Sequence, residues 1–384
     1  MLTYLFNIDS IFYRSFISFL LSFFISHFSY KRIICWNHKT KNGIKENVRN
    51  LGLIEEKKKI GIPTMGGFVM IFSTLISTIL FSSLQNIYVI ILIITLIFIG
   101  LIGFIDDYIK IKYHNKKGLS IMGKILGQTI ISFFIGTIIY FYPNSSIHQS
   151  FFDKTKHGFQ TTIPMFSQKY SKKEFDYSYI LSWYNKKLEK YTWIIFIPIV
   201  IFIVIFFSNG SNITDGIDGL NAGLSAISFV TLSILSIISS NKIYSQYFHS
   251  IYIPGLEETI IFSCSFLGTL ISYLWYNSYP AQIFMGDMGS LPIGGSIAIL
   301  AILNRKELLL PFICGIFFME NISVLIQICY FKFSKKKYGI GRRIFRMTPI
   351  HHHFQKLGYH ENKICSRFFI IQIILSILVF IFLI

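Results

Sequence analysis

Five of the eight aspartates in this chain gather at three places, each at the edge of an apolar stretch: Asp106 with Asp107, Asp215 with Asp218, and Asp287. Carboxylates brought together at a low-dielectric boundary repel one another, so they need a cation or basic side chains among them. Oxygen ligands without cysteine favour Mg²⁺ or Mn²⁺, and Mg²⁺ commonly shares its coordination shell with substrate phosphates. The acids therefore predict a divalent-metal site. For Asp106 and Asp107 alone, a solvated helix end is an equally good interpretation.

Glycine-rich segments accompany these acids at residues 61–67 (GIPTMGG), 209–223 (NGSNITDGIDGLNAG) and 284–295 (FMGDMGSLPIGG). Each segment puts glycine beside polar residues where a helix is expected to start, which would leave backbone N–H groups free for an anion. Basic residues lie nearby, at Lys57–Lys59, Lys110, Lys112, Lys124 and in the run 342–354. Acids for a metal and bases for a phosphate suit phosphoryl transfer.

Several other residues allow two interpretations. His351, His352 and His353 are consecutive, and consecutive helical side chains point about 100 degrees apart, so they seldom bind one ion; phosphate contact by at least one is favoured over a plain polar loop. Glu320 lies inside an apolar stretch, either as a functional acid or as a partner for a neighbouring helix. Phe284 either packs in the core or stacks on a flat ring.

The composition decides the class of protein. Hydrophobic residues make up 53% of the 384 residues and charged residues 14%, which is too apolar for a soluble domain. The net charge of +18 could suggest a nucleic-acid partner, but the charges lie between the apolar stretches, so a lipid bilayer is expected and no nucleic acid. The five cysteines are scattered without a C-x-x-C pair, which argues against a disulfide scaffold or a zinc site.

We expect an all-α, polytopic membrane protein that forms a single integral-membrane domain over residues 1–384. A membrane-spanning helix needs about 20 apolar residues. About ten candidate stretches meet this need: 11–30, 65–83, 87–105, 124–142, 192–207, 217–238, 260–276, 288–303, 308–331 and 368–384.

The distribution of basic residues predicts the orientation. The loops 31–64, 106–124, 208–216, 277–287 and 332–367 hold 24 of the 36 Lys and Arg residues. Basic loops stay in the cytoplasm, so these loops should be cytoplasmic and form the active site, with both termini periplasmic. The even number of spans then brings the three acidic clusters to the cytoplasmic face.

The segment 143–191 would lie outside although it contains eight Lys residues. It is longer than a connection needs, so it is either a small external cap or a mobile insert.

The motifs GIPTMGG, GFIDDYIKI, SNITDGIDGLNAG, YNSYPAQIFMGDMGSL and RMTPIHHHF occur in this order over about Lys59 to Glu361. With these five motifs in this order, the chain resembles the phospho-N-acetylmuramoyl-pentapeptide transferases, which belong to the superfamily of polyprenyl-phosphate sugar-1-phosphate transferases. The resemblance implies a ten-helix enzyme of the bacterial inner membrane, working in peptidoglycan biosynthesis. It implies transfer of phospho-MurNAc-pentapeptide from UDP-MurNAc-pentapeptide to undecaprenyl phosphate, giving lipid I and UMP with Mg²⁺ as cofactor, and makes a homodimer plausible.

The same resemblance implies roles for individual residues. Asp287 corresponds to the Mg²⁺ ligand, Asp106 and Asp107 to a catalytic pair at the lipid phosphate, and His351 to a further catalytic residue. The implied substrate-binding residues are Lys59, Lys110, Lys124, Asn209, Asn212, Asp215, Asp218, Asn277, Phe284, His352 and His353.

Two alternative functions remain. Another polyprenyl-phosphate N-acetylhexosamine-1-phosphate transferase would share the acidic motifs. A membrane transporter belongs to a different class, and its acids would gather near the middle of the bilayer rather than at one edge.

Overall fold

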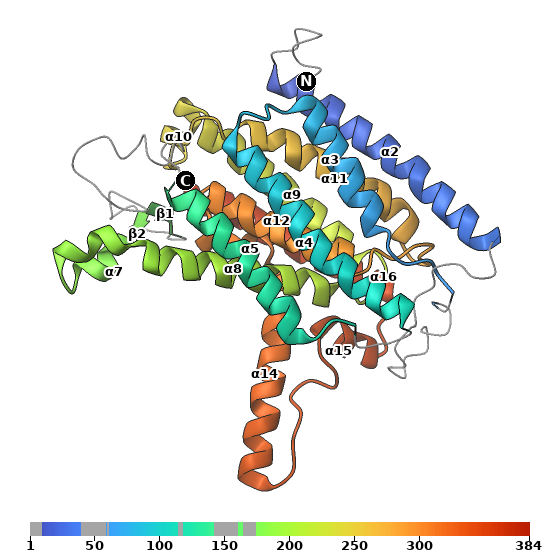
Figure 1. Cartoon of the computed structure of the whole chain (residues 1–384). Coiled ribbons are helices and arrows are strands. Elements are labelled where there is room, and N and C mark those ends of the chain that lie inside the picture. Colours follow the sequence, from blue (N-terminus) through green and yellow to red (C-terminus); the bar gives the residue numbers. More distant parts are fainter. Residues whose placement is uncertain (1–9, 40–58, 60, 114–117, 142–159, 164–173) are drawn as a thin grey trace.

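The structure is a computed structural model that describes residues 10–39, 59, 61–113, 118–141, 160–163 and 174–384. It is an all-α bundle with one small sheet (Figure 1). The long helices are α2 (Ile11–Lys39), α3 (Gly67–Phe81), α4 (Ile87–Lys112), α5 (Ile121–Phe141), α8 (Trp193–Thr214), α9 (Leu220–Ser240), α11 (Glu258–Asn277), α12 (Asp287–Leu303), α14 (Gly315–Tyr338) and α16 (Glu361–Leu383). Shorter helices are α7 (Ser178–Ser182), η2 (Lys186–Tyr191), α10 (Lys242–Tyr247), η3 (Glu307–Leu309), α13 (Leu310–Ile313) and α15 (Ile350–Lys356).

The fold class confirms the expectation of a polytopic membrane protein. Eight of the described helices are long and apolar enough to cross a bilayer. The other two predicted spans correspond to α3, with 15 residues, and α12, with 17 residues. At 1.5 Å per residue these helices are only about 22 and 25 Å long, below the roughly 30 Å of a hydrocarbon core. Ten crossings and periplasmic termini therefore stay predictions.

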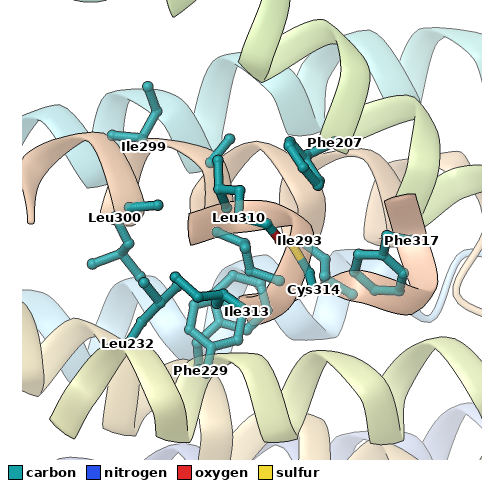
Figure 2. Packing of buried hydrophobic residues seen from close by; sticks show 14 of the residues in the cluster. Phe207, Phe229, Leu232, Ile293, Ile299, Leu300, Leu310, Ile313, Cys314 and Phe317 are labelled. Carbon is teal, nitrogen blue, oxygen red and sulfur yellow. Dashed lines mark hydrogen bonds between the residues drawn. The ribbon is translucent and has the colours of Figure 1, made fainter. Parts of the chain in front are cut away.

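Helix α12 is the centre of the bundle. All of its residues are buried, and it packs against α4, α8 and α9. In Figure 2, Ile293 and Leu300 of α12 lie among Phe207 of α8 and Phe229 of α9. A helix surrounded by other helices in this way has little contact with lipid, so its length need not match the hydrocarbon core.

The predicted span 308–331 is wrong as one continuous helix. The chain forms η3 and α13, breaks at Cys314 with φ −134° and ψ 54°, and restarts as α14. The buried amide of Gln372 on α16 replaces the missing helical bonds: its Nε2 donates to the carbonyls of Phe312 and Ile313, and its Oε1 accepts from the Ile316 amide. Beyond the break, α14 projects away from the other helices (Figure 1).

The predicted cytoplasmic loops are partly helical. Helix α4 continues to Lys112 and α5 begins at Ile121, so both ends of the predicted loop 106–124 are helical; α8 continues to Thr214, through most of 208–216. Helix α2 likewise extends to Lys39, beyond the predicted end at residue 30. Hydropathy marks only the apolar part of a helix, whereas backbone hydrogen bonding continues into its polar end.

The described part of the insert 143–191 is attached to the bundle. Strands β1 (Gln160–Thr162) and β2 (Glu174–Asp176) pair antiparallel, and α7 and η2 follow. The Thr162 amide donates to the Arg305 carbonyl at 3.1 Å, beyond the end of α12 that is opposite to Asp287. We call this described part the cap; its position outside the membrane stays a prediction, and residues 142–159 and 164–173 lie outside the described chain.

Candidate active site

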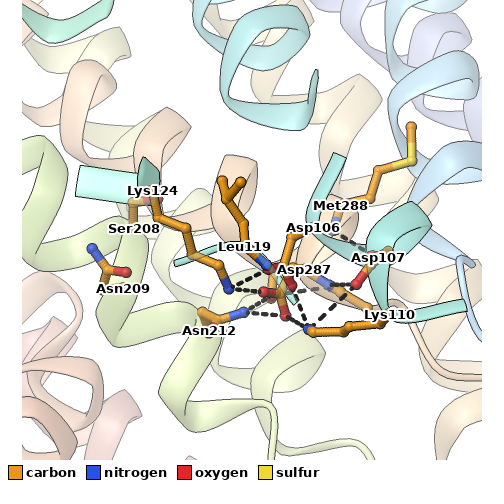
Figure 3. A network of polar contacts seen from close by, with 12 residues as sticks. Asp106, Asp107, Lys110, Leu119, Lys124, Ser208, Asn209, Asn212, Asp287 and Met288 are labelled. Atoms are coloured by element: carbon orange, nitrogen blue, oxygen red, sulfur yellow. Dashed lines mark hydrogen bonds and ion pairs between the residues drawn. The ribbon is translucent and has the colours of Figure 1, made fainter. Parts of the chain in front are cut away.

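Three aspartates meet where α4 ends and α12 begins (Figure 3). One carboxylate oxygen from each of Asp106, Asp107 and Asp287 lies within 4.8 Å of the others. The predicted convergence of these two acidic clusters is thereby confirmed. All three side chains are nearly buried, so their charges must be balanced by neighbours rather than by water.

Asp107 fixes the start of α12. Its Oδ1 accepts from the Asp287 amide at 3.1 Å, and its Oδ2 accepts from the Met288 amide at 2.9 Å. These are amides of a first helical turn, which have no partner within their own helix and favour negative charge. Gly286, at φ +70°, and Gly103 permit this approach, because a Cβ on Gly286 would collide with the Asp107 carboxylate and one on Gly103 with the Asp287 carbonyl.

Two lysines lie among the three carboxylates. Lys110 Nζ is 2.5 Å from Asp106 Oδ2 and 3.2 Å from Asp287 Oδ1. Lys124 Nζ is 3.0 Å from Asp106 Oδ1 and 2.5 Å from Asp287 Oδ2. Both lysines remain partly exposed, so the positive charge that balances the acids is on flexible side chains that can also reach a ligand.

The two predicted asparagines of α8 differ in their contacts. Asn212 Nδ2 donates to Asp287 Oδ1 at 2.9 Å and to Ser290 Oγ at 2.8 Å, so it orients the acid directly. Asn209 Nδ2 donates instead to Gln128 Oε1 on α5 and to the Ile205 carbonyl. Of the two, the structure brings only Asn212 into the acidic cluster.

A second polar cluster forms around Lys59. Its Nζ lies 2.7 Å from Asp218 Oδ1 and 3.0 Å from Glu361 Oε2. Burial lowers the pKa of Lys59, but the charges of Asp218 and Glu361 outweigh this effect and raise it. Glu361 Oε2 also accepts from the Asp218 amide, so the carboxylate joins Lys59 to the loop that contains Asp218. Asp215 lies half-buried directly after α8 in this loop.

The predicted anion sites on glycine amides are wrong for the GIPTMGG segment. The amides of Gly66 and Gly67 donate to the carbonyls of Phe284 and Met285, and the Phe284 amide donates to the Pro63 carbonyl. A Cβ on Gly67 would collide with the backbone of Gly289. These glycines allow close packing against the start of α12 rather than binding phosphate.

Asn277 and Phe284 lie beside this segment. Asn277 is buried, accepts from the Gly219 amide at 2.9 Å and donates to the Ile283 carbonyl at 2.8 Å, so it ties the Asp218 loop to residues before α12. Phe284 is half-buried with its main chain fully paired, which leaves part of the ring accessible.

The three consecutive histidines have three different partners. His351 is fully buried, with Nδ1 3.0 Å from Glu320 Oε1 on α14, so Glu320 is a partner of a neighbouring helix. His352 Nδ1 lies 2.6 Å from Gln355 Oε1. His353 Nδ1 accepts from the Arg346 amide. The three side chains therefore share no hydrogen-bond partner among the described residues.

The residues present fit a divalent cation. The donors are carboxylate oxygens, which suit a hard ion such as Mg²⁺. Both oxygens of Asp107 accept backbone amides of α12, and Lys110 Nζ lies 3.6 Å from its Oδ1. Asp106 and Asp287 each lie within 3.2 Å of both Lys110 and Lys124, which could turn to a phosphate. Asp287 and Asp106 are therefore the residues best placed to hold the ion.

Sequence reasoning missed several residues of the site, namely Glu361, Gln355 and Ser290. Glu361 begins a helix that hydropathy placed seven residues later, and no spacing marked it. Ser290 could have been found, because a residue three positions after Asp287 faces the same side of a helix.

Comparison with known proteins agrees with this geometry. The family model for glycosyl transferase family 4 matches residues 88–305. The chain is 47% identical over 381 residues to a phospho-N-acetylmuramoyl-pentapeptide-transferase of Flavobacterium psychrophilum, covering 95% of this chain and 92% of the relative. The proteins of the same name from Flavobacterium johnsoniae and Porphyromonas gingivalis are 46% and 40% identical, with the same coverage. The chain therefore belongs to glycosyl transferase family 4 and, within it, to the phospho-N-acetylmuramoyl-pentapeptide transferases.

Proposed function

We propose that this enzyme transfers phospho-MurNAc-pentapeptide from UDP-MurNAc-pentapeptide to undecaprenyl phosphate, forming lipid I and releasing UMP. The reaction takes place at the cytoplasmic face of the bacterial inner membrane and requires Mg²⁺. The observation that carries the proposal is the meeting of Asp106, Asp107 and Asp287 with Lys110 and Lys124 at one end of the bundle. A transporter would place such charges near the middle of its helices.

Binding of the substrates and neutralisation of their phosphate charges account for most of the catalysis. Two anionic phosphate groups must approach each other, and Lys110 and Lys124 can offer their charge to these groups because both are partly exposed. Bound Mg²⁺ would neutralise charge on the phosphoryl oxygens and on the leaving UMP. Asp287 is held for this role by Asn212, which fixes one of its oxygens.

Proton transfer contributes less. A phosphomonoester has a second pKa near 6, so at pH 7 about nine-tenths of the lipid phosphate is already a dianion and needs no base. Asp106 is fully buried, and both of its oxygens are within 3.0 Å of lysine ammonium groups. We therefore assign Asp106 to holding the ion and the lysines in place.

A direct, single displacement fits the geometry better than a covalent intermediate on Asp107. Both oxygens of Asp107 accept backbone amides of α12, so an attack by this carboxylate would release the start of the helix that carries Asp287. Exchange of labelled UMP into UDP-MurNAc-pentapeptide without any lipid acceptor would contradict this assignment.

The remaining sequence-derived residues form the nucleotide and sugar pocket in this proposal. Lys59, Asp218 and Phe284 line it, with the Phe284 ring stacking on uracil. Asn277 positions the loop that contains Asp218 by accepting from the Gly219 amide, and the family resemblance assigns Asp215 and Asn209 to the same pocket.

Incubation of the purified protein with UDP-MurNAc-pentapeptide, undecaprenyl phosphate and Mg²⁺ tests the proposal. Lipid I and UMP should appear in equal amounts, EDTA should stop the reaction, and added Mg²⁺ should restore it. UDP-N-acetylglucosamine serves as the matched control substrate. Product from this control alone would assign the chain to another polyprenyl-phosphate transferase, and the absence of lipid-linked product from either would end the enzyme proposal.

A further inference from the structure

His352 lies at one end of a chain of hydrogen bonds that begins in the Lys59 cluster. Its Nδ1 is 2.6 Å from Gln355 Oε1, one turn along α15. Gln355 Nε2 donates to Glu361 Oε1 at 3.0 Å, and the other oxygen of Glu361 accepts from Lys59 and from the Asp218 amide. The histidine is thus connected to the loop that contains Asp218.

This chain determines which nitrogen of His352 carries its proton. The Glu361 carboxylate, paired with Lys59, only accepts hydrogen bonds, so the amide of Gln355 must turn its NH₂ group toward it. The amide oxygen then faces His352, and Nδ1 must be the protonated nitrogen. Nε2 is left with a lone pair, and no residue in the described chain forms a hydrogen bond with it.

The surroundings also keep His352 neutral. His352 is 9% exposed. Burial, the neighbouring His351, and the positive charges of Lys59 and Lys356 lower the pKa of His352 to about 3, although the bond with Gln355 acts in the opposite direction. In the described part of the chain, the charged or titratable groups that act on His352 or belong to its neighbours and hydrogen-bond partners are Lys59, Glu320 on α14, His351, His353 and Lys356 on α15, and Glu361 on α16.

We infer that His352 Nε2 accepts a hydrogen bond from a neutral N–H or O–H group of the nucleotide-sugar substrate, and that Gln355 and Glu361 are the positioning residues that fix it in this form. A neutral acceptor does not bind phosphate, so His352 is excluded from the phosphate contact expected of at least one histidine. His351 differs, because a carboxylate rather than an amide faces its Nδ1. The inference rests on the proposed function, which supplies the substrate class.

A spectroscopic measurement tests the tautomer without any assay. Selective ¹⁵N labelling of the ten histidines, with His352→Asn used to assign the signal, reports which ring nitrogen is protonated. The His352 signal should show protonated Nδ1 throughout pH 6 to 8, and Gln355→Leu should abolish this preference. A protonated Nε2 in the wild-type protein, or an imidazolium at pH 6, would overturn the inference even if lipid I is made.

A matched pair of substitutions tests the direction of the hydrogen bond. His352→Gln keeps an acceptor, whereas His352→Lys offers only donors and a positive charge. The glutamine variant should keep the KM for UDP-MurNAc-pentapeptide within about threefold, and the lysine variant should raise it about tenfold or more, the scale of one lost hydrogen bond. The reverse order would identify a phosphate contact, and equal losses would leave only a packing role; either result contradicts the inference. Gel filtration and thermal unfolding confirm that both variants fold.

The positioning role of Gln355 can be tested through the pH dependence of KM. Gln355→Glu puts a carboxylate opposite Nδ1 and should make His352 protonatable, so KM should rise as the pH falls from 8 to 6 while kcat changes little. The wild-type KM should be flat over this range, and Gln355→Leu should raise KM at every pH. A KM of Gln355→Glu that does not depend on pH would contradict the role. If the wild-type enzyme makes no lipid I, the proposed function fails, whereas the tautomer measurement still decides the state of His352.

Discussion

The two ends of α12 carry buried charged clusters of opposite kinds. At its start, Asp287 shares two lysines with Asp106, and these lysines keep 17% and 27% of their side-chain surface exposed. Beyond its end, Arg305, Lys306 and Glu307 are 3%, 0% and 4% exposed.

The partners of the two clusters differ as well. Lys306 Nζ donates to Thr162 Oγ1 of β1 and to Ser250 Oγ, and the Tyr177 hydroxyl donates to Glu307 Oε1 at 2.9 Å. Thr162 and Tyr177 belong to the cap and Ser250 to a neighbouring loop, and together they enclose the charges. Under the proposed function, the cluster at the start of α12 keeps its compensating charges on side chains that can move, whereas the cluster beyond its end has them enclosed.

The largest effect should come from replacing the acid at the start of α12. Asp287→Asn removes the charge that faces both lysines and the proposed ion, so the rate of lipid I formation should fall about 10³-fold or more. Glu307→Gln, at the other end, is the matched control and should retain activity within about twofold. Equal losses of lipid I formation in the two variants would contradict the proposal that only the start of α12 takes part in catalysis.

The second-largest effect on lipid I formation should come from Asp106 and tests whether it acts as a base. Asp106→Asn should lower the rate of lipid I formation about 10²-fold, because a neutral amide no longer holds Lys110 and Lys124. The loss should be the same from pH 6 to 9, measured as the ratio of variant to wild-type rate. Steep recovery of the variant at alkaline pH would instead identify Asp106 as a base.

Changes in the enclosed cluster of Arg305, Lys306 and Glu307 should alter the stability of the protein rather than its activity. Burial lowers the pKa of Lys306 to about 7, partly opposed by the charges of Glu307 and Glu174. Between this value and the ordinary value near 10.4, the unfolded chain binds a proton that the folded chain lacks, so stability should increase with pH from about 7 to 10.

The slope of this increase is at most about 1.4 kcal/mol per pH unit. Lys306→Met should remove this contribution and be more stable at pH 7, as followed by thermal unfolding in detergent. The same pH dependence in both proteins would exclude Lys306 as its source. Activity of the variant should stay within about twofold of the wild type.

The smallest effect concerns the cap itself. Tyr177→Phe leaves one oxygen of buried Glu307 without its hydroxyl partner, which should cost about 1–3 kcal/mol of stability. Chemical denaturation measures this cost, and Tyr184→Phe, at a highly exposed residue of the same segment, is the control. A loss of lipid I formation in Tyr177→Phe at a temperature where the protein is folded would connect the cap to catalysis.

Much of this arrangement follows from the sequence. Apolar length predicts most of the helices, and parity predicts that the three acidic clusters share one face, because they lie at the edges of alternating spans. The structure brings Asp106, Asp107 and Asp287 together, whereas Asp218 pairs with Lys59 in a separate cluster. The break at Cys314 is not visible in hydropathy, since both sides of it are apolar and the compensating Gln372 comes from another helix.

The site was less predictable where long-range hydrogen bonds decide it. Glycine at a helix start suggests a free amide, but whether Gly66 and Gly67 are free depends on residues more than 200 positions away. Glu361 has an ordinary local sequence, and only tertiary structure brings it to Lys59. Motif resemblance named Asn209 and Asn212 together, although their amide groups have different partners.

Because Asp107 binds the main chain of α12, substitutions should be restricted differently at the two positions that form the bond. Position 288 contributes only its amide to this link, so any residue that fits the buried space there can keep the bond, whereas position 107 requires an acceptor of one particular length. The orientation of Asp287 is thus inherited from α4, and a shift of α4 by even one residue would misplace it. Relatives with altered spacing between these two helices should therefore be rare, however freely their outer caps differ.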